Sequence, residues 1–335
     1  MAQRHPDPTP GAVTGEALAE HLRAQATEFL RALRLHREGG PGADLDGAVR
    51  ALRRSARRIS GSLHTFRPLL DTGWAESVRP ELAWVSGTLA QEQAYAARLE
   101  RLLLALHRLS GTPVLPAQAP GLGGPASERG KVAVGAAKAG ALLERQLTLA
   151  RTRAHSATLR ALAGSRFHAV ADTVALLAGE VPLTPAAAGA DLRPLAAAAE
   201  ERLAAAVTAL PLVRAGHPYN AEALVHGLSP DPSPHPQDAP WHQVRLLLRL
   251  HRYAREVLHG DDLTDVRLTA AGQALDRHRD ASEAATAAAQ AARTPRIAPA
   301  TAYALGVLHA DQRHEVEAAR YAFQRSWGKQ TVGTS

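Results

Sequence analysis

Residues 49–70 read VRALRRSARRISGSLHTFRPLL, which is a pattern of apolar and basic residues with helical spacing. Its apolar residues recur at alternating spacings of three and four, which is typical of one stripe of an α-helix. They are Val49, Leu52, Ala56, Ile59, Leu63 and Phe66. The opposite face carries Arg50, Arg53, Arg54, Arg57 and Arg58. We therefore predict an amphipathic helix with a strongly basic outer face.

The basic face lacks the acids that a surface helix normally carries. Between residues 47 and 70 there are six arginines and no carboxylate. Surface helices usually combine Glu with Lys or Arg, because pairs of opposite charge four residues apart stabilise a helix. The pattern fits either a solvated basic face or a surface that meets an anion. His64 lies between the apolar and basic faces and is a candidate for the same surface.

The composition indicates a basic, arginine-rich protein of the cytoplasm. The chain has 335 residues, with 39 basic residues against 32 acidic ones. Only three of the basic residues are lysines and the remaining 36 are arginines, whose planar fork binds phosphate through two hydrogen bonds. Without cysteine there is no disulfide or thiol chemistry. No apolar leader and no long apolar run occurs, so we expect a soluble, non-secreted protein without membrane contact.

Helical periodicity covers most of the chain, and no alternating strand pattern is convincing, so the predicted fold class is all-α. The expected helices cover residues 15–39, 49–70, 78–109, 128–163, 165–179, 186–210, 240–259, 263–292 and 299–328. We expect a disordered leader (1–14), a first helical half (15–109), a Pro/Gly linker (110–127), the remaining helices (128–328) and a tail (329–335). Short connections favour antiparallel bundles.

A second basic helix, expected over residues 240–259, contains WHQVRLLLRLHRYAREVL. His242, Arg245, Arg249 and Arg252 form one narrow stripe, and leucines cover much of the remaining surface. Such a helix is usually buried, and buried guanidinium groups are costly unless they are paired. Few acids lie nearby in the sequence, so we favour an anion-binding groove over internal ion pairs.

The two basic helices share a spacing. Arg50, Arg53 and Arg57 recur after 192 residues as His242, Arg245 and Arg249. Two related halves, each with one basic helix, explain this offset.

Several blocks together carry a family resemblance. Beside the two basic helices they include ELAWVSGTLAQEQ, SRFHAVADTVALL and LDRHRDA. Over residues 15–328 the chain resembles the CHAD family, the conserved-histidine α-helical domain. The resemblance implies two pseudo-symmetric antiparallel helical bundles facing a central basic cleft or pore. It also implies non-catalytic binding of inorganic polyphosphate, and attachment to polyphosphate granules fits that activity.

The resemblance assigns several of the candidate binding residues, and the basic faces of the expected helices supply the others. Arg53, Arg57 and Arg58 stand where the family has arginines, and Arg50 replaces its histidine. The polyphosphate-binding set is Arg50, Arg53, Arg57, Arg58, His64, His242, Arg245, Arg249 and Arg252, with Arg54, Arg166, Lys138 and His278 as additional candidates. The sequence departs from the family pattern at Ser60 and Leu250, where basic residues are usual.

Three other functions stay open. Nucleic-acid binding fits the charge but lacks an aromatic RNA-binding motif or a cysteine knuckle. An enzyme is disfavoured, because phosphoryl transfer with Mg²⁺ needs clustered carboxylates and the basic helices carry almost none. The third possible function is that of a CHAD scaffold that has lost its ligand and acts through contact with another protein. We expect no metal and no cofactor. His278 and Asp280 point to different sides of a helix, which favours a packing or capping role over proton transfer.

Overall fold

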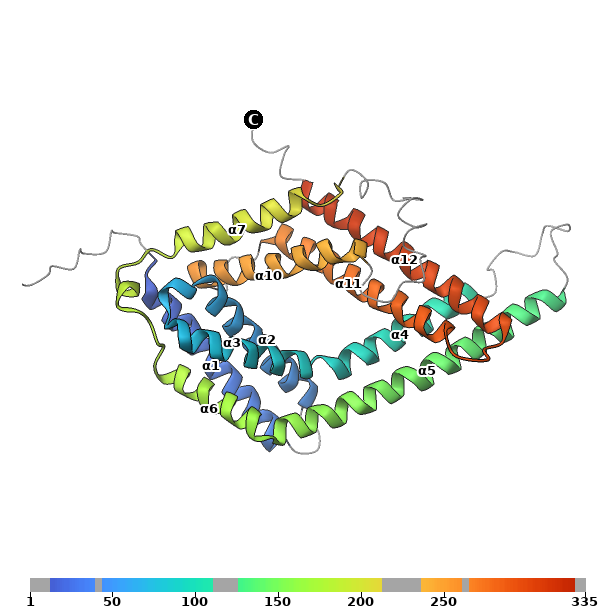
Figure 1. Ribbon diagram of the computed structural model, residues 1–335, viewed down its shortest axis with the longest axis horizontal. Helices are drawn as coiled ribbons and strands as arrows, with labels where there is room; N and C mark the ends of the chain where they lie inside the picture. Colours follow the sequence, from blue (N-terminus) through green and yellow to red (C-terminus); the bar gives the residue numbers. More distant parts are fainter. Residues whose placement is uncertain (1–12, 40–43, 111–125, 213–235, 261–264, 329–335) are drawn as a thin grey trace, which may run out of the picture. The chain divides into compact units, whose positions relative to one another are not determined.

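The computed structural model describes residues 13–39, 44–110, 126–212, 236–260 and 265–328, without the side chains of residues 126–132. Within these ranges the structure is all-helical (Figure 1), and no β-strand occurs, although an isolated antiparallel bridge joins Leu70 to Leu183. The expected leader (1–14), linker (110–127) and tail (329–335) lie wholly or almost wholly outside the described residues.

The helices agree closely with the sequence pattern. Their bounds are α1 (Gly15–Glu38), α2 (Leu45–Thr65), η1 (Arg67–Leu69), α3 (Thr72–Thr88), α4 (Gln91–Ser110), α5 (Ala126–Ala163), α6 (Ser165–Gly179), η2 (Pro185–Ala188), α7 (Arg193–Thr208), η3 (Pro236–Asp238), α10 (Ala239–His259), α11 (Val266–Ala292) and α12 (Pro299–Gly328). The all-α prediction is confirmed.

The prediction of one helix over residues 78–109 is wrong, because a turn separates α3 from α4. α3 ends at Thr88 and α4 begins at Gln91. Gly87 lies in the last turn of α3, and glycine weakens a helix. Leu89 lies in the turn and is nonetheless buried, so the apolar periodicity continues through the break.

The basic helix begins and ends earlier than its apolar stripe indicated. Asp44 caps α2, and its carboxylate accepts a hydrogen bond from the Gly47 amide at 2.6 Å. The helix ends at Thr65, and Pro68 lies in the short helix η1 that follows. Proline lacks an amide hydrogen, so it cannot extend α2.

The helices form two compact units, each built from three separate segments. The segments are 1–91, 154–209 and 246–266 in unit 1, and 92–153, 210–245 and 267–335 in unit 2. Helices α5 and α10 contribute to both units. The units therefore differ from consecutive halves of the chain. The expected pseudo-symmetry and the central basic cleft stay predictions.

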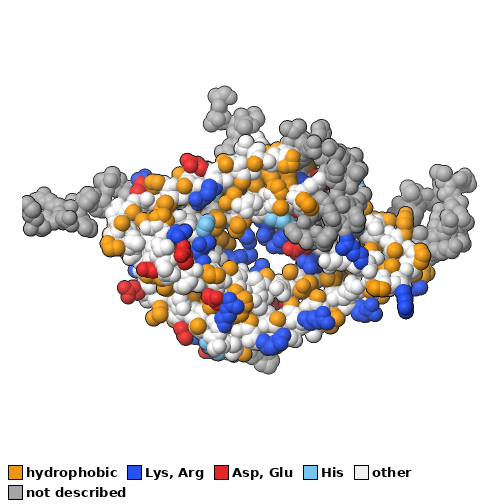
Figure 2. Space-filling view, viewed as in Figure 1, with side chains coloured by type: hydrophobic (Ala, Val, Ile, Leu, Met, Phe, Trp, Pro, Cys, Tyr) orange, Lys and Arg blue, Asp and Glu red, His pale blue; other side chains and the backbone are white. Residues whose placement is uncertain are grey.

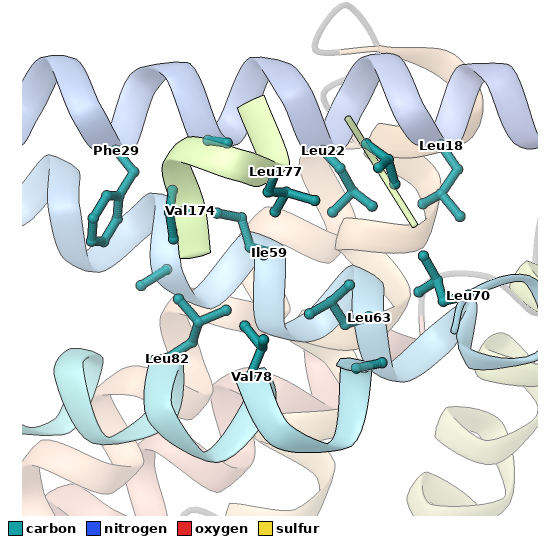
Figure 3. Packing of buried hydrophobic residues seen from close by; sticks show 14 of the residues in the cluster. Leu18, Leu22, Phe29, Ile59, Leu63, Leu70, Val78, Leu82, Val174 and Leu177 are labelled. Carbon is teal, nitrogen blue, oxygen red and sulfur yellow. The ribbon is translucent and has the colours of Figure 1, made fainter. Parts of the chain in front are cut away.

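The core of unit 1 lies between α1, α2, α3 and α6 (Figure 3). α1 and α2 contribute Leu18, Leu22, Ile59 and Leu63, and these four side chains are fully buried. Figure 3 shows Val174 and Leu177 of α6, with Val78 and Leu82 of α3, completing the cluster. This packing fixes which face of α2 enters the apolar core and leaves its arginine face outside that core.

The core of unit 2 depends on small side chains. Buried alanines of α11 pack with leucines of α4, α5 and α12, among them Leu102, Leu143, Leu305 and Leu308. Thin side chains allow helices to approach closely. No described helix is both long and apolar enough to cross a lipid bilayer.

Candidate functional site

The arginine face of α2 has the predicted orientation. Leu52, Ile59 and Leu63 are fully buried, whereas Arg50 and Arg54 are exposed. Arg53, Arg57 and Arg58 are partly buried. On the face of the molecule shown in Figure 2, basic side chains are more widespread than acidic ones.

In unit 1, α2 packs directly against the second basic helix, α10. Gly61 makes this possible, because a Cβ atom there would lie 2.5 Å from Cδ2 of Tyr253 and 3.4 Å from Cδ2 of Leu250. Three residues earlier on α2, Arg58 reaches Glu256, three residues later on α10. Since the pairings advance in opposite directions along the two helices, α2 and α10 cross in an antiparallel sense.

Arg58 forms an internal ion pair at this crossing. Its Nε donates to Oε2 of Glu256 at 2.8 Å and its Nη2 donates to Oε1 at 3.3 Å. The side chains are 22% and 16% exposed. This pair corrects the interpretation of the face as free of carboxylates, because Glu256 lies 198 residues away in the chain. The pair uses one edge of the guanidinium, and Nη1 lies on the other.

The other arginines at the crossing are Arg57 of α2 and Arg249 and Arg252 of α10, all partly buried. Nε of Arg57 is buried and has no hydrogen-bond partner within the described ranges. The antiparallel register places Arg249 at the level of Thr65, one helical turn beyond Gly61 and next to His64 in the chain. The crossing therefore concentrates arginines from both basic helices.

Further arginines lie near His64 in unit 1. Its pKa lies below the ordinary value because it loses part of its hydration and because Arg79, Arg202 and Arg67 lie nearby. These arginines belong to α3, α7 and η1. Sequence reasoning missed Arg79 and Arg202, since neither belongs to a basic helix and only the fold brings them near α2.

In unit 2, α10 carries His242 and Arg245. Nε of Arg245 donates to Oδ1 of Asp276 on α11 at 2.6 Å, and the Arg245 side chain is 13% exposed. The sequence interpretation favoured an anion groove over such a pair, so for Arg245 it is corrected. Burial lowers the pKa of His242; the charge of Asp238 opposes this and that of Arg245 adds to it.

His278 lies behind His242 and is 1% exposed. Its ring stacks on Trp241, with centroids 5.6 Å apart, and meets the His242 ring edge-on at 5.5 Å. Burial, together with the charge of Arg320, lowers the pKa of His278 well below its ordinary value. A buried, neutral histidine does not reach an anion in solvent, and the ring of the additional candidate His278 packs against Trp241 and His242.

A buried ion network supports this end of α10. Oδ2 and Oδ1 of Asp238 accept hydrogen bonds from Arg313 at 2.7 and 3.2 Å, and Oδ1 accepts another from Arg320 at 2.7 Å. Burial raises the pKa of the Asp238 carboxyl, but Arg313 and its neighbours outweigh burial and hold it well below its usual range. The sequence carried no signal for this network beyond an aspartate just before a helix.

The remaining candidates differ in their surroundings. Arg166 pairs with Glu81 through two hydrogen bonds of 2.7 and 2.9 Å and stacks over Trp84, so its fork is occupied. Arg50 lies 3.5 Å from Asp44 at the exposed start of α2. Lys138 is exposed on α5.

No group of three or more His, Asp or Glu side chains able to hold a metal ion occurs in the part of the chain that the structure describes.

Comparison with known proteins agrees with this architecture. The family model of the CHAD domain matches residues 24–289. The solved structure "PptA from Streptomyces chartreusis" is 69% identical, with a TM-score of 0.80 over 95% of this chain and 100% of that chain. The CHAD domain from the plant Ricinus communis is 18% identical, with a TM-score of 0.52 over 92% of each chain. No curated protein matches. The protein therefore belongs to the CHAD-domain family.

Proposed function

We propose that this protein binds inorganic polyphosphate without catalysis, and that the crossing of α2 and α10 in unit 1 forms its main binding surface. The observation that carries the proposal is the antiparallel crossing itself, which gathers Arg57, Arg58, Arg249 and Arg252. The polyphosphate expectation that came with the family resemblance agrees with this geometry.

Arginine chemistry supports a phosphate chain as the ligand. A polyphosphate offers regularly repeated anionic oxygens and no base or sugar to recognise. A planar guanidinium binds two such oxygens at once, and several forks on neighbouring turns bind successive phosphates. Affinity then comes from the sum of many charged contacts, so it should fall steeply with salt as counterions are released.

Nucleic acid fits the crossing less well. Single strands need exposed aromatic rings on which bases stack. Tyr253 packs at the Gly61 contact. The crossing therefore offers charge without a stacking platform, and polyphosphate should compete well with DNA.

The absence of catalysis is part of the proposal. Metal-assisted phosphoryl transfer needs carboxylates grouped around Mg²⁺. At the crossing, Glu256 is engaged by Arg58 and does not belong to such a group of carboxylates. Incubation with polyphosphate and Mg²⁺ should release no phosphate above the rate without protein.

A scaffold role is the second candidate, and the internal ion pairs favour it. Arg58, Arg166 and Arg245 are all engaged by carboxylates of the same chain. If these pairs do not open, the remaining charge supports only weak binding, and the CHAD fold then serves as a surface for another protein.

The test is a titration with long-chain polyphosphate over a salt series, with single- and double-stranded DNA as competitors. Arg57→Ala and Arg252→Ala should each raise Kd about tenfold and flatten the salt dependence, because each removes a charged contact. Arg31→Ala is the matched control, since it removes an exposed arginine of α1 that pairs with Glu28. If neither substitution at the crossing changes Kd, the scaffold role is favoured.

A further inference from the structure

A carboxylate of the chain lies among the arginines of the α2–α10 crossing. On α10, Glu256 follows Arg252 by one helical turn and Arg249 by two, so the three residues share one face. Its two oxygens accept hydrogen bonds from Nε and Nη2 of Arg58. Two anionic oxygens on one edge of a guanidinium are also what a phosphate group presents. Glu256 therefore holds an edge of Arg58 that a phosphate group could bind.

The partial burial of Glu256 strengthens the effect of its charge. Its side chain is 16% exposed, whereas Glu28, which pairs with Arg31, is 39% exposed. Asp276, which pairs with Arg245, is 54% exposed. Charges interact more strongly where less water surrounds them. Glu256 should therefore attract a neighbouring arginine, and repel a neighbouring anion, more strongly than these exposed acids do.

The contact between α2 and α10 does not depend on this ion pair alone. Tyr253 packs against Gly61 one helical turn before Glu256. Ala254 and Val257, on either side of Glu256 in the sequence, are buried in the apolar core of unit 1. These contacts stay in place if the carboxylate leaves Arg58, so the pair can open while α10 keeps its position.

We infer that Glu256 is an internal competitor of the anionic ligand, and that a phosphate group displaces its carboxylate from Arg58 on binding. The inference rests on the proposed function. In the free protein, Glu256 neutralises part of the arginine charge and stabilises the crossing. In the complex, phosphate oxygens accept the hydrogen bonds of Arg58, and Glu256 becomes an acid beside a polyanion. This exchange lowers the affinity of the crossing for its ligand.

The first test compares Kd of long-chain polyphosphate for the unmodified protein and for Glu256→Gln. Glutamine has the shape of glutamate and keeps one acceptor oxygen for Arg58, but it carries no charge. Kd should fall about fivefold, because a like charge beside the ligand is removed. The matched control is Glu28→Gln, which changes net charge equally by removing the acid that pairs with Arg31 on α1, and it should change Kd far less. Circular dichroism verifies that both variants fold.

The second test follows the ion pair directly. The Nε–H resonance of Arg58 is assigned in ¹⁵N spectra by its loss in Arg58→Gln. When polyphosphate is added to the unmodified protein, this resonance should shift, because its acceptor changes from a carboxylate to a phosphate oxygen. If the ligand binds and the resonance stays in place, the pair remains closed and displacement is wrong.

Failure of this inference differs from failure of the proposed function. If Arg57→Ala weakens binding but Glu256→Gln does not tighten it, the competitor role is wrong and the crossing stands. Equal changes in Glu256→Gln and Glu28→Gln also overturn the inference, because net charge alone then explains the effect. If neither the unmodified protein nor Glu256→Gln binds polyphosphate, the proposed function itself is wrong.

Discussion

Arg58 and Glu256, which are 198 residues apart in the chain, join the two basic helices through a pair of hydrogen bonds. The carboxylate engages Nε and Nη2 and so fixes the direction of the guanidinium. An arginine that an ion pair already holds loses less conformational entropy when it binds a ligand, because its side chain has already lost rotamer freedom. The ion pair therefore holds the Arg58 side chain in one orientation at the crossing.

Removing Glu256 should destabilise the crossing. Glu256→Ala leaves a partly buried guanidinium without this carboxylate, and we expect the free energy of unfolding to fall by about 1–3 kcal/mol. Glu256→Gln keeps one acceptor oxygen and should cost less. Urea unfolding monitored by circular dichroism measures both. If the alanine variant and the unmodified protein are equally stable, solvent screens the ion pair and the pair adds nothing to the free energy of unfolding.

Gly61 should be intolerant of a side chain only while Tyr253 is present. Alanine favours a helix over glycine by about 1 kcal/mol, but its Cβ would collide with the Tyr253 ring, and overpacking costs about 1–3 kcal/mol. We expect Gly61→Ala to destabilise the protein and to become stabilising in a Tyr253→Ala background. A double-mutant cycle in urea measures this change of sign. Purely additive effects would contradict the close contact.

The buried network should carry a large share of the stability of unit 2. Asp238→Asn leaves Arg313 and Arg320 buried without their shared charge, so we expect a loss of about 3–5 kcal/mol. Ser282→Ala removes one neutral donor to Asp238 and should cost only about 1 kcal/mol. Chemical unfolding of both variants makes the comparison. Similar small losses in the two variants would show that the carboxylate charge is not what holds the network together.

The helices were predictable from sequence because their apolar stripes repeat locally. The pattern of α2 depends on residues three and four apart, so Ile59 and Leu63 fall on the buried face as expected. The turn at Leu89 was missed because a buried leucine keeps the period intact through the break. Periodicity indicates which side is buried, and it says little about where a helix ends.

The partners of the candidate residues were not predictable in the same way. Asp276 lies 31 residues after Arg245, and Glu256 lies 198 residues after Arg58. No sequence rule links positions so far apart, and the shortage of nearby acids suggested unpaired arginines. The arginines that surround His64 come from three other elements and needed the fold to be found. Arginine-rich faces can therefore be recognised in the sequence. The fraction of those arginines that pair with acids of the same chain cannot.

Stability should decrease in mild acid because buried histidines resist protonation. The pKa values of five histidines lie below 6.5, with burial as the largest cause: His36, His64, His242, His251 and His278. A histidine whose folded pKa is lowered binds fewer protons than the unfolded chain below 6.5. The free energy of unfolding therefore falls as pH drops below that value. Each fully titrating histidine adds a slope of up to about 1.4 kcal/mol per pH unit.

His278 should contribute most to this slope, since it is the most buried of the five. His278→Gln should be less stable at neutral pH, because it loses the stack on Trp241, yet it should lose less stability between about pH 6.5 and 5. Urea unfolding at several pH values measures the difference, with the exposed His168→Gln as control. The same pH slope in the His278 variant would show that its titration does not limit acid stability.

A polyphosphate chain bound beside His64 in unit 1, or beside His242 in unit 2, should cause that histidine to take up a proton. Both histidines have lowered pKa values in the free protein, partly because of neighbouring arginines. A bound polyanion offsets those positive charges and favours the imidazolium, so the pKa of each histidine rises in the complex. A group whose pKa is higher in the complex strengthens binding as pH falls through the interval between its two pKa values. Affinity should therefore increase as pH drops toward about 6.

Calorimetry in buffers of different ionisation enthalpy counts the protons taken up. His64→Gln and His242→Gln should each reduce proton uptake and flatten the pH dependence of Kd, while His168→Gln should do neither. An unchanged proton count in the His64 variant would place the ligand away from the His64 end of the crossing. The same result for His242 would restrict binding to the arginines of unit 1, since His242 belongs to the part of α10 in unit 2.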